Sequence, residues 1–264
     1  MPLNEIIFDE DTLFSYIGYA AGLATILTFT IQILKIIETK KVTNLSSYMY
    51  IIYTLGLVCW AAYGIYIEDW ILVVANFITF FFTFTILLLI IYYDAEDKIE
   101  RERRDELTYV FNRKYFEQTV PVRLAEAKTL SQESAILAIN SINYRSTHEK
   151  NGVKAGNKIL KSLAKFLEKD LRENDLVARF EDDKFVIYLA DANDKSAQIV
   201  ANRLLKNAEL IKVKISKKEE IETKIKIGIC TTQHASTMEE LLEKAEKAAK
   251  SISAKSADKI KLAD

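Results

Sequence analysis

The chain has 264 residues, enough for one large domain or two modest ones. Its formal net charge of −1 gives no overall positive field, which argues against nucleic acid as a partner. It has only two histidines, which argues against a zinc site, and its two cysteines imply no disulfide framework.

Three long runs in the first third of the chain contain no Asp, Glu, Lys or Arg: residues 13–34, 46–67 and 70–93. Each run is long enough to cross a bilayer core of about 30 Å as a helix. Three such runs in succession leave little other protein to bury them. They are therefore predicted to be transmembrane helices rather than buried helices of a soluble protein.

The loops between these runs differ in charge. The first connection carries Lys35, Lys40 and Lys41, whereas the second carries Glu68 and Asp69 and no base. Four further bases follow the third run: Lys98, Arg101, Arg103 and Arg104. The positive-inside rule then predicts an inner or plasma membrane protein with its N-terminus outside and its C-terminal domain in the cytoplasm.

The predicted membrane domain, residues 1–93, resembles the SemiSWEET (PQ-loop) transporter unit. The resemblance covers roughly residues 13–93. The matching segments are Tyr16–Gly22, Gln32, Lys40–Ser46, Trp60–Gly64 and Asn76. The resemblance implies three helices per protomer in a parallel homodimer that encloses a path for a small sugar. It also places Trp60 and Asn76 at the sugar pocket, where an indole face and an amide suit a sugar. The alternative is that Trp60 only packs and that Asn76 makes an interhelical hydrogen bond.

One position in the first helix departs from the SemiSWEET pattern. Ile31 stands before Gln32, where the family has the proline that bends this helix. A unit without that bend is expected to suit a sensor better than a carrier.

The segment over residues 94–107 is almost purely charged and contains neither glycine nor proline. Closely spaced acids and bases favour a solvated helix that continues from the third span. Such a linker either transmits a signal between the two parts or serves as a spacer, and both interpretations stay open.

Residues 108–264 alternate short apolar runs with amphipathic stretches, which predicts an α+β domain. After a helix that ends near residue 127, the expected elements are a strand at 135–142, a helix at 153–171, a hairpin of 176–180 and 185–189, a helix at 196–206, strands at 210–215 and 221–230, a helix at 237–251 and a strand at 259–262. This order fits an antiparallel sheet with helices on its faces.

The predicted hairpin carries the charged block Glu181-Asp182-Asp183-Lys184, followed by Phe185. This block resembles the signature of GGDEF domains, which condense two GTP into cyclic di-GMP; the signature here reads Glu-Asp-Asp-Lys-Phe. Upstream, Asp105–Phe116 resembles the motif that opens these domains, with Tyr109 in place of a glycine. The resemblance implies a nucleotide cyclase-like fold.

Most positions that the resemblance assigns to chemistry have changed. Asn140 replaces a metal-binding Asp, Lys184 replaces a Glu, and acidic side chains fill both glycine positions, while Asp183 remains acidic. His148 and Asn157 replace the guanine-reading Asn and its partner Asp. No catalytic residue and no metal site are therefore expected, and Mg²⁺ would enter only with residual nucleotide binding.

A second motif of these domains is intact. Arg172-x-x-Asp175 matches the inhibitory RxxD motif at the family's spacing from the signature, and Arg203 falls where the family has a second arginine. The resemblance implies a cyclic di-GMP site at these residues. Without the family spacing, the same pattern is an exposed ion pair.

These observations predict a non-catalytic membrane signalling protein that couples a small ligand at its membrane unit to cyclic di-GMP. Three alternatives stay open: a sugar transporter gated by its cytoplasmic domain, a diguanylate cyclase with an atypical site, and a soluble domain that only dimerises the membrane part. Fold alone does not separate them.

Overall fold

The computed structural model describes residues 10–215, 219–253 and 256–263. Its chain forms two compact units, one within residues 1–100 and one over residues 101–264. Each unit is described below by itself.

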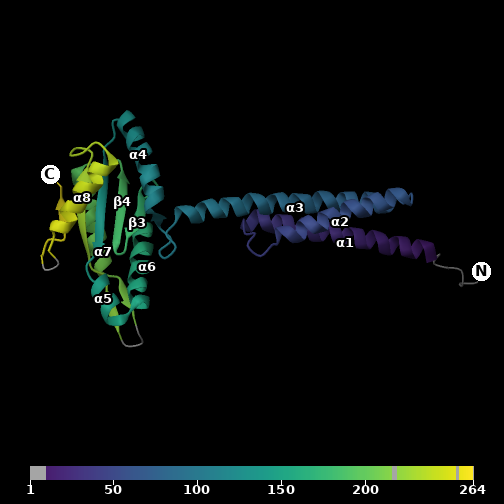
Figure 1. Ribbon diagram of the computed structural model, residues 1–264, viewed down its shortest axis with the longest axis horizontal. Helices are drawn as coiled ribbons and strands as arrows, with labels where there is room; N and C mark the ends of the chain where they lie inside the picture. Colours follow the sequence, from purple (N-terminus) through teal and green to yellow (C-terminus); the bar gives the residue numbers. More distant parts are fainter. Residues whose placement is uncertain (1–9, 216–218, 254–255, 264) are drawn as a thin grey trace, which may run out of the picture. The chain divides into compact units, whose positions relative to one another are not determined.

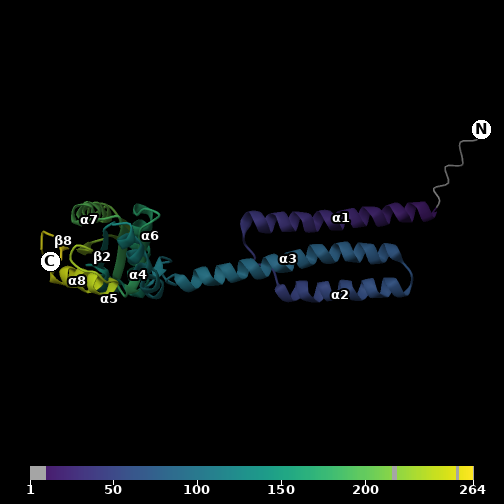
Figure 2. The ribbon, with the colours of Figure 1, turned by 90° about the horizontal axis from the view of Figure 1, so that it is seen from above.

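Three long apolar helices form the first unit: α1 (Glu10–Thr39), α2 (Ser47–Tyr66) and α3 (Trp70–Arg103). Each is long and apolar enough to cross a membrane, which confirms the three predicted spans. Figure 2 shows α3 lying between α1 and α2. The helix α2 begins where the Ser46 hydroxyl accepts a hydrogen bond from the Met49 amide, as an N-cap.

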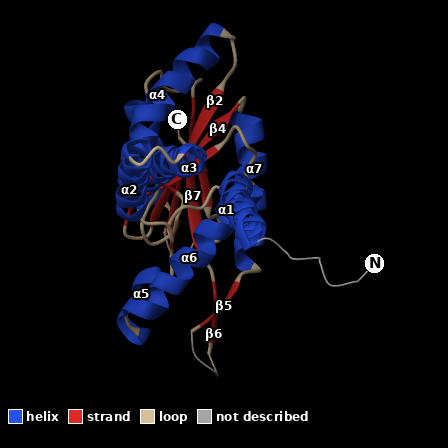
Figure 3. Cartoon of the chain, turned by 90° about the vertical axis from the view of Figure 1, so that its right-hand side faces the viewer, coloured by secondary structure: helices blue, strands red, loops and turns tan. Residues whose placement is uncertain are grey.

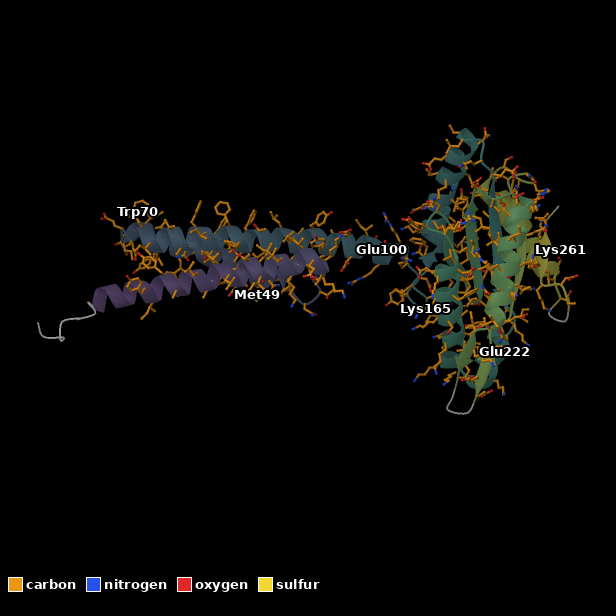
Figure 4. The ribbon with its side chains drawn as sticks, turned by 180° about the vertical axis from the view of Figure 1, so that it is seen from behind. Met49, Trp70, Glu100, Lys165, Glu222 and Lys261 are labelled. Atoms are coloured by element: carbon orange, nitrogen blue, oxygen red, sulfur yellow. The ribbon has the colours of Figure 1, made fainter. Side chains whose placement is uncertain are left out.

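The charged linker is helical over residues 94–103, because α3 continues without a break from Trp70 to Arg103, whereas residues 104–107, also expected in the helix, lie outside it. Figure 4 marks this helix by the labelled side chains of Trp70 and Glu100. The absence of glycine and proline from the linker explains why its backbone continues the helix of the third span.

The described helices of the membrane unit pack through a small core and leave most apolar side chains outside it. Ile36, Ile86 and Ile90 are buried in that core, and the Thr54 and Thr83 hydroxyls lie 3.4 Å apart between α2 and α3. Large apolar side chains cover the outer surfaces of all three helices. Such surfaces suit lipid tails rather than water.

The second unit is built on a six-stranded sheet in the order β1-β3-β4-β2-β7-β8. Figure 3 draws strands in red and labels β2, β4 and β7 of this sheet. The four central strands pair antiparallel, while β1 pairs parallel with β3 and β8 pairs parallel with β7. The strands are β1 (Phe111–Asn112), β2 (Ser134–Ser141), β3 (Leu176–Glu181), β4 (Lys184–Ala190), β7 (Ile225–Thr231) and β8 (Ile260–Leu262).

Helices cover both faces of this sheet (Figure 1). One face packs against α4 (Arg113–Thr129) and α8 (Met238–Ser251), and the other against α6 (Val153–Asp170) and α7 (Asp194–Glu209). Alternating residues of β2 serve the two cores, since Ile136 belongs to one and Leu137 to the other. Both cores lie within residues 107–263, so the unit carries its own hydrophobic interior.

The structure differs from the predicted elements at three places. The strand expected at 221–230 is divided into β6 (Glu220–Glu222), which pairs with β5 (Lys212–Lys214), and β7 in the main sheet. The division follows from Asn143, whose side chain accepts from the Lys224 amide and donates to the Glu222 carbonyl. The short helix α5 (Tyr144–Asn151) and the two-residue strand β1 were not predicted.

Candidate functional site

The signature block forms the tip of the β3–β4 hairpin. Glu181 pairs in register with Lys184, so Asp182 and Asp183 occupy the turn. The turn is held by backbone contacts: the Arg179 guanidinium donates to the Asp182 carbonyl at 2.9 Å, and the Ser141 amide donates to the Asp183 carbonyl at 3.2 Å. The changed signature therefore still closes an ordered hairpin.

Asn140 lies beside this tip because β2 pairs with both β4 and β7. It is in register with Lys184 on one side and with Lys226 on the other. A hollow of about 450 Å³ opens at this point. Its lining comprises Asn140, Ser141, Ile142, Arg145, Glu181, Asp182, Asp183, Lys184, Lys226 and Lys250.

The Lys184 ammonium is held by carboxylates. Its Nζ lies 2.9 Å from Glu246 Oε1 and 3.5 Å from Glu181 Oε2. The Lys184 side chain is 14% exposed, and Glu246 is 20% exposed. Arg113 also pairs with Glu181, at 3.2 Å. Protein cations thus pair with the carboxylates of Glu181 and Glu246.

The residues at this site do not fit the divalent cation that the fold family implies. Mg²⁺ favours carboxylate oxygens, yet Asn140 offers an uncharged amide and Lys184 a positive charge. Across the described ranges, no cluster of three or more His, Cys, Asp or Glu side chains is arranged to hold a metal ion. We therefore derive no chemical step through a metal.

His148 and Asn157 lie on α5 and α6, and neither lines the 450 Å³ hollow in the described structure. The His148 ring stacks on Tyr144, with ring centroids 5.7 Å apart. Gly156 fits closely against both side chains, since a Cβ there would lie 2.9 Å from the Tyr144 ring and 3.2 Å from His148 Cβ. His148 thus packs locally.

The RxxD motif forms the turn that leads into β3. The Asp175 carboxylate accepts from the Arg172 amide at 3.0 Å and from the Ala190 amide at 3.2 Å. The Asp175 amide in turn donates to the Arg172 carbonyl at 3.0 Å. Asp175 therefore fixes the backbone of the turn, and the Arg172 side chain is exposed.

Arg203 reaches this turn from α7. Its guanidinium donates to the carboxylate and to the carbonyl of Asp170, both at 2.8 Å, and Asp170 precedes Arg172 by two residues. The structure therefore joins Arg203 to the end of α6, two residues before the RxxD turn. A further arginine, Arg123 on α4, donates to the Asn174 carbonyl inside the motif at 2.7 Å. Sequence reasoning missed Arg123 because only the packing of α4 beside β3 brings it there.

Asp105 connects the start of the domain to the hairpin. Its carboxylate accepts from the Thr108 amide and hydroxyl and from Arg179, at 2.6 to 3.1 Å. Burial alone would raise the pKa of Asp105, but these hydrogen bonds and the charge of Arg179 outweigh it, so the pKa is lowered. Because Arg179 also holds Asp182, one guanidinium bridges Asp105 and the signature turn.

The two predicted sugar-pocket residues lie on different helices of the membrane unit, Trp60 on α2 and Asn76 on α3. The Trp60 ring meets Tyr63 edge to face, at 6.0 Å between centroids, and is 56% exposed. The Asn76 amide donates to the Leu72 carbonyl of its own helix at 2.7 Å. That bond leaves the Asn76 carbonyl oxygen as an acceptor.

Comparison with known families divides the chain in the same way. Residues 102–259 match the diguanylate cyclase GGDEF domain, and residues 13–98 match the sugar efflux transporters for intercellular exchange. The sugar transporter SemiSWEET of Leptospira biflexa is 41% identical over 71 residues, which are 27% of this chain and 84% of the transporter.

The GGDEF region is similar to proteins of Pseudomonas aeruginosa, a bacterium with a diguanylate cyclase called TpbB. Its diguanylate cyclase TpbB is 31% identical over 146 residues, which are 54% of this chain and 33% of TpbB. This chain therefore spans about a third of that enzyme. A solved TpbB structure comprising only the GGDEF domain superimposes with a TM-score of 0.56 at 30% identity, over 61% of this chain and 94% of that one.

Proposed function

We propose that this chain, which belongs to the GGDEF family and carries a SemiSWEET unit at its N-terminal end, is a membrane receptor for cyclic di-GMP. In this proposal the protein binds cyclic di-GMP but does not make it. The observation that carries the proposal is a contrast within one domain. The signature residue Lys184 is ion-paired to Glu246, whereas the RxxD turn is formed and is joined by Arg203.

The lost synthesis follows from the charge of the site. Phosphoryl transfer needs a cation that bridges the phosphates and neutralises the developing charge. Asn140 supplies no charge to hold such an ion, and Lys184 repels it. Glu181 and Asp182 add negative charge where the family's glycines let a triphosphate approach the backbone. At surface-like screening, one close like-charge pair opposes binding by up to about 4 kcal/mol.

The geometry of the RxxD turn supports a ligand that carries both phosphate and guanine. An arginine fork pairs with phosphate oxygens or with the edge of a guanine. Asp175 uses one lone pair of each oxygen on a backbone amide, so its carboxylate retains capacity for guanine N–H donors. Arg203 retains donors beyond those bound to Asp170.

We assign the membrane unit the role of an input that binds a small sugar at Trp60 and Asn76, in a parallel homodimer. The proline missing at Ile31 favours sensing over carriage. Sugar flux into proteoliposomes that exceeds flux into protein-free vesicles would instead favour a transporter gated by the GGDEF domain.

The first test is turnover. We expect the purified unit of residues 101–264 to produce no cyclic di-GMP from GTP with Mg²⁺ or Mn²⁺, as measured by chromatography and mass spectrometry of the products. Repeated turnover would refute the non-catalytic assignment.

The second test is binding of a fluorescent cyclic di-GMP analogue to the same unit. Arg172→Ala and Arg203→Ala should each weaken binding at least about tenfold, a loss of roughly 1.4 kcal/mol. The matched control is Arg145→Ala, an exposed arginine that lines the signature hollow and should leave binding unchanged. If Arg145→Ala weakens binding and the two RxxD-site variants do not, the ligand binds in the signature hollow rather than at the RxxD turn.

A further inference from the structure

A second hollow, of about 410 Å³, lies between α4 and α8 at the tip of the β3–β4 hairpin, and we call this hollow the α4–α8 groove. The RxxD turn lies at the opposite end of β3. Apolar side chains of Phe180, Met238 and Leu242 form the interior of the groove. Its charged lining comprises Arg113, Glu117, Glu181, Lys184, Glu239, Glu243 and Glu246. Figure 2 shows the two helices on the same side of the domain.

The groove is acidic, since its lining of two bases and five acids has a formal charge of −3. Both of its cations are already engaged by its own acids: Arg113 lies 2.7 Å from Glu117, and Lys184 lies 2.9 Å from Glu246. Glu239 and Glu243 stand exposed on the rim, one turn apart on α8. Glu243 pairs with Lys247, but both side chains are exposed. This pair therefore contributes little, and the Glu243 carboxylate stays available to a partner.

Two groove residues are signature positions at which the chain departs from the GGDEF pattern. Glu181 stands at a glycine position and Lys184 at a glutamate position. Their ion-pair partners Arg113 and Glu246 line the groove as well, as does Glu117, which pairs with Arg113. These two substitutions and their ion-pair partners thus form one connected set of charges along this groove.

We infer that the α4–α8 groove docks a lysine- or arginine-rich amphipathic helix of a partner protein. The apolar ridge of such a helix matches Phe180, Met238 and Leu242, and its flanking cations match the carboxylates on the rim. The partner is expected to be basic because its cations complement the net negative charge of the groove, and such complementarity governs partner choice at an exposed rim. The inference is independent of cyclic di-GMP binding, because it uses none of the three residues of the RxxD site.

The test uses the unit of residues 101–264, which carries both of its hydrophobic cores. The probe is a fluorescein-labelled peptide of about 18 residues, five helical turns, with leucines at helical spacing and lysines on both flanks. The same peptide with glutamate at every lysine position serves as the negative probe. We expect saturable anisotropy with the basic peptide at tens of micromolar or below, weakened by added salt, and none with the acidic peptide.

Variants locate the binding. Glu239→Gln together with Glu243→Gln reduces the negative charge of the groove from −3 to −1 and should weaken binding about tenfold at low salt. The matched control is Glu149→Gln with Glu209→Gln, two exposed helical glutamates outside the groove, which should change binding less than about twofold. Both pairs are exposed, so circular dichroism should show the same folded domain in each case.

Three results would overturn the inference. They are no binding of the basic peptide up to about 500 µM, equal binding of the acidic peptide, or equal affinity of the two double variants. Leu242→Asn adds an independent check, because it should weaken the peptide without altering the salt dependence that the rim carboxylates produce.

Discussion

Single residues in this protein link the start of the GGDEF domain to its signature turn. Asp105 binds Arg179 through an ion pair of 3.1 Å with side chains 24% and 15% exposed, and Arg179 binds the Asp182 carbonyl. Arg179 is therefore the shared partner of the Asp105 carboxylate and the Asp182 backbone. The pair is sheltered enough to contribute to stability, unlike the exposed pairs elsewhere on the domain.

The Asp105 pair makes the stability of the domain depend on pH. The pKa of Asp105 is lowered in the folded state, so its contribution is present above the unfolded value of about 3.9 and is lost as pH falls through the lower folded value. We expect Asp105→Asn to reduce the free energy of unfolding by about 1–2 kcal/mol at pH 7 and by less below about pH 4. Urea denaturation of residues 101–264 measures this difference.

Asp258→Asn, at an exposed position, is the control for the Asp105 experiment and should change stability little at either pH. If the destabilisation by Asp105→Asn is the same at about pH 3.5 as at about pH 7, roughly half a unit below and three units above the unfolded pKa, the charge of Asp105 is not its cause.

Residue identities indicated which positions of the site had changed, but not what those side chains contact. The sequence identified Lys184 by its place in the signature and Asn140 by its place at a metal-binding position of the family, and β2–β4 pairing does bring them together. The partner Glu246 and the arginine Arg123 come from helices far along the chain. Their positions depend on tertiary packing, which has no short-range sequence pattern.

At the scale of elements, α8 lies unusually close to the sheet over Gly228 of β7. A Cβ at Gly228 would lie 2.0 Å from the Ala245 carbonyl oxygen and 2.4 Å from the Ala249 amide nitrogen, both backbone atoms of α8. The helix presents alanines to the strand here, so no flexible side chain is available to move aside. This close packing also positions Glu246, which holds Lys184.

Gly228→Ala should therefore lower the free energy of unfolding of residues 101–264 by about 3 kcal/mol, because α8 must shift as a whole. Thermal and urea denaturation measure the effect. The control is Cys230→Ala, two residues along the same strand in the same core, which removes only one buried atom and should cost about 1 kcal/mol. Equal effects of the two substitutions would show that α8 moves freely over β7.

Helices and strands with a strong apolar pattern were predicted from the sequence. Elements whose position depends on tertiary contacts between distant residues were not. The three membrane helices follow from long runs without charge, the hairpin from two short apolar runs around a charged block, and α6 and α8 from amphipathic stretches. The helix α5 has only eight residues and no apolar stripe, and the two residues of β1 are placed by pairing with β3 and by a bridge from Phe111 to Arg104. The separation of β6 from β7 depends on Asn143, a contact across 79 residues of sequence.

At the scale of the whole molecule, the charge bias of the loops predicts the side of the membrane on which each loop lies. With Cys59 and Cys230 replaced by alanine, Glu68→Cys should react with an impermeant maleimide added outside cells. Lys41→Cys should react only after the membrane is opened. Labelling of Glu68→Cys only from the cytoplasmic side would reverse the proposed orientation.

The central claim is that this domain has kept a cyclic di-GMP site and lost its GTP site. Calorimetric titration of residues 101–264 with each nucleotide tests both halves in one measurement. We predict saturable heat with cyclic di-GMP at a micromolar dissociation constant, equivalent to roughly −8 kcal/mol, and no saturable heat with GTP and Mg²⁺. Saturable heat with GTP and none with cyclic di-GMP at high micromolar concentration would contradict the claim.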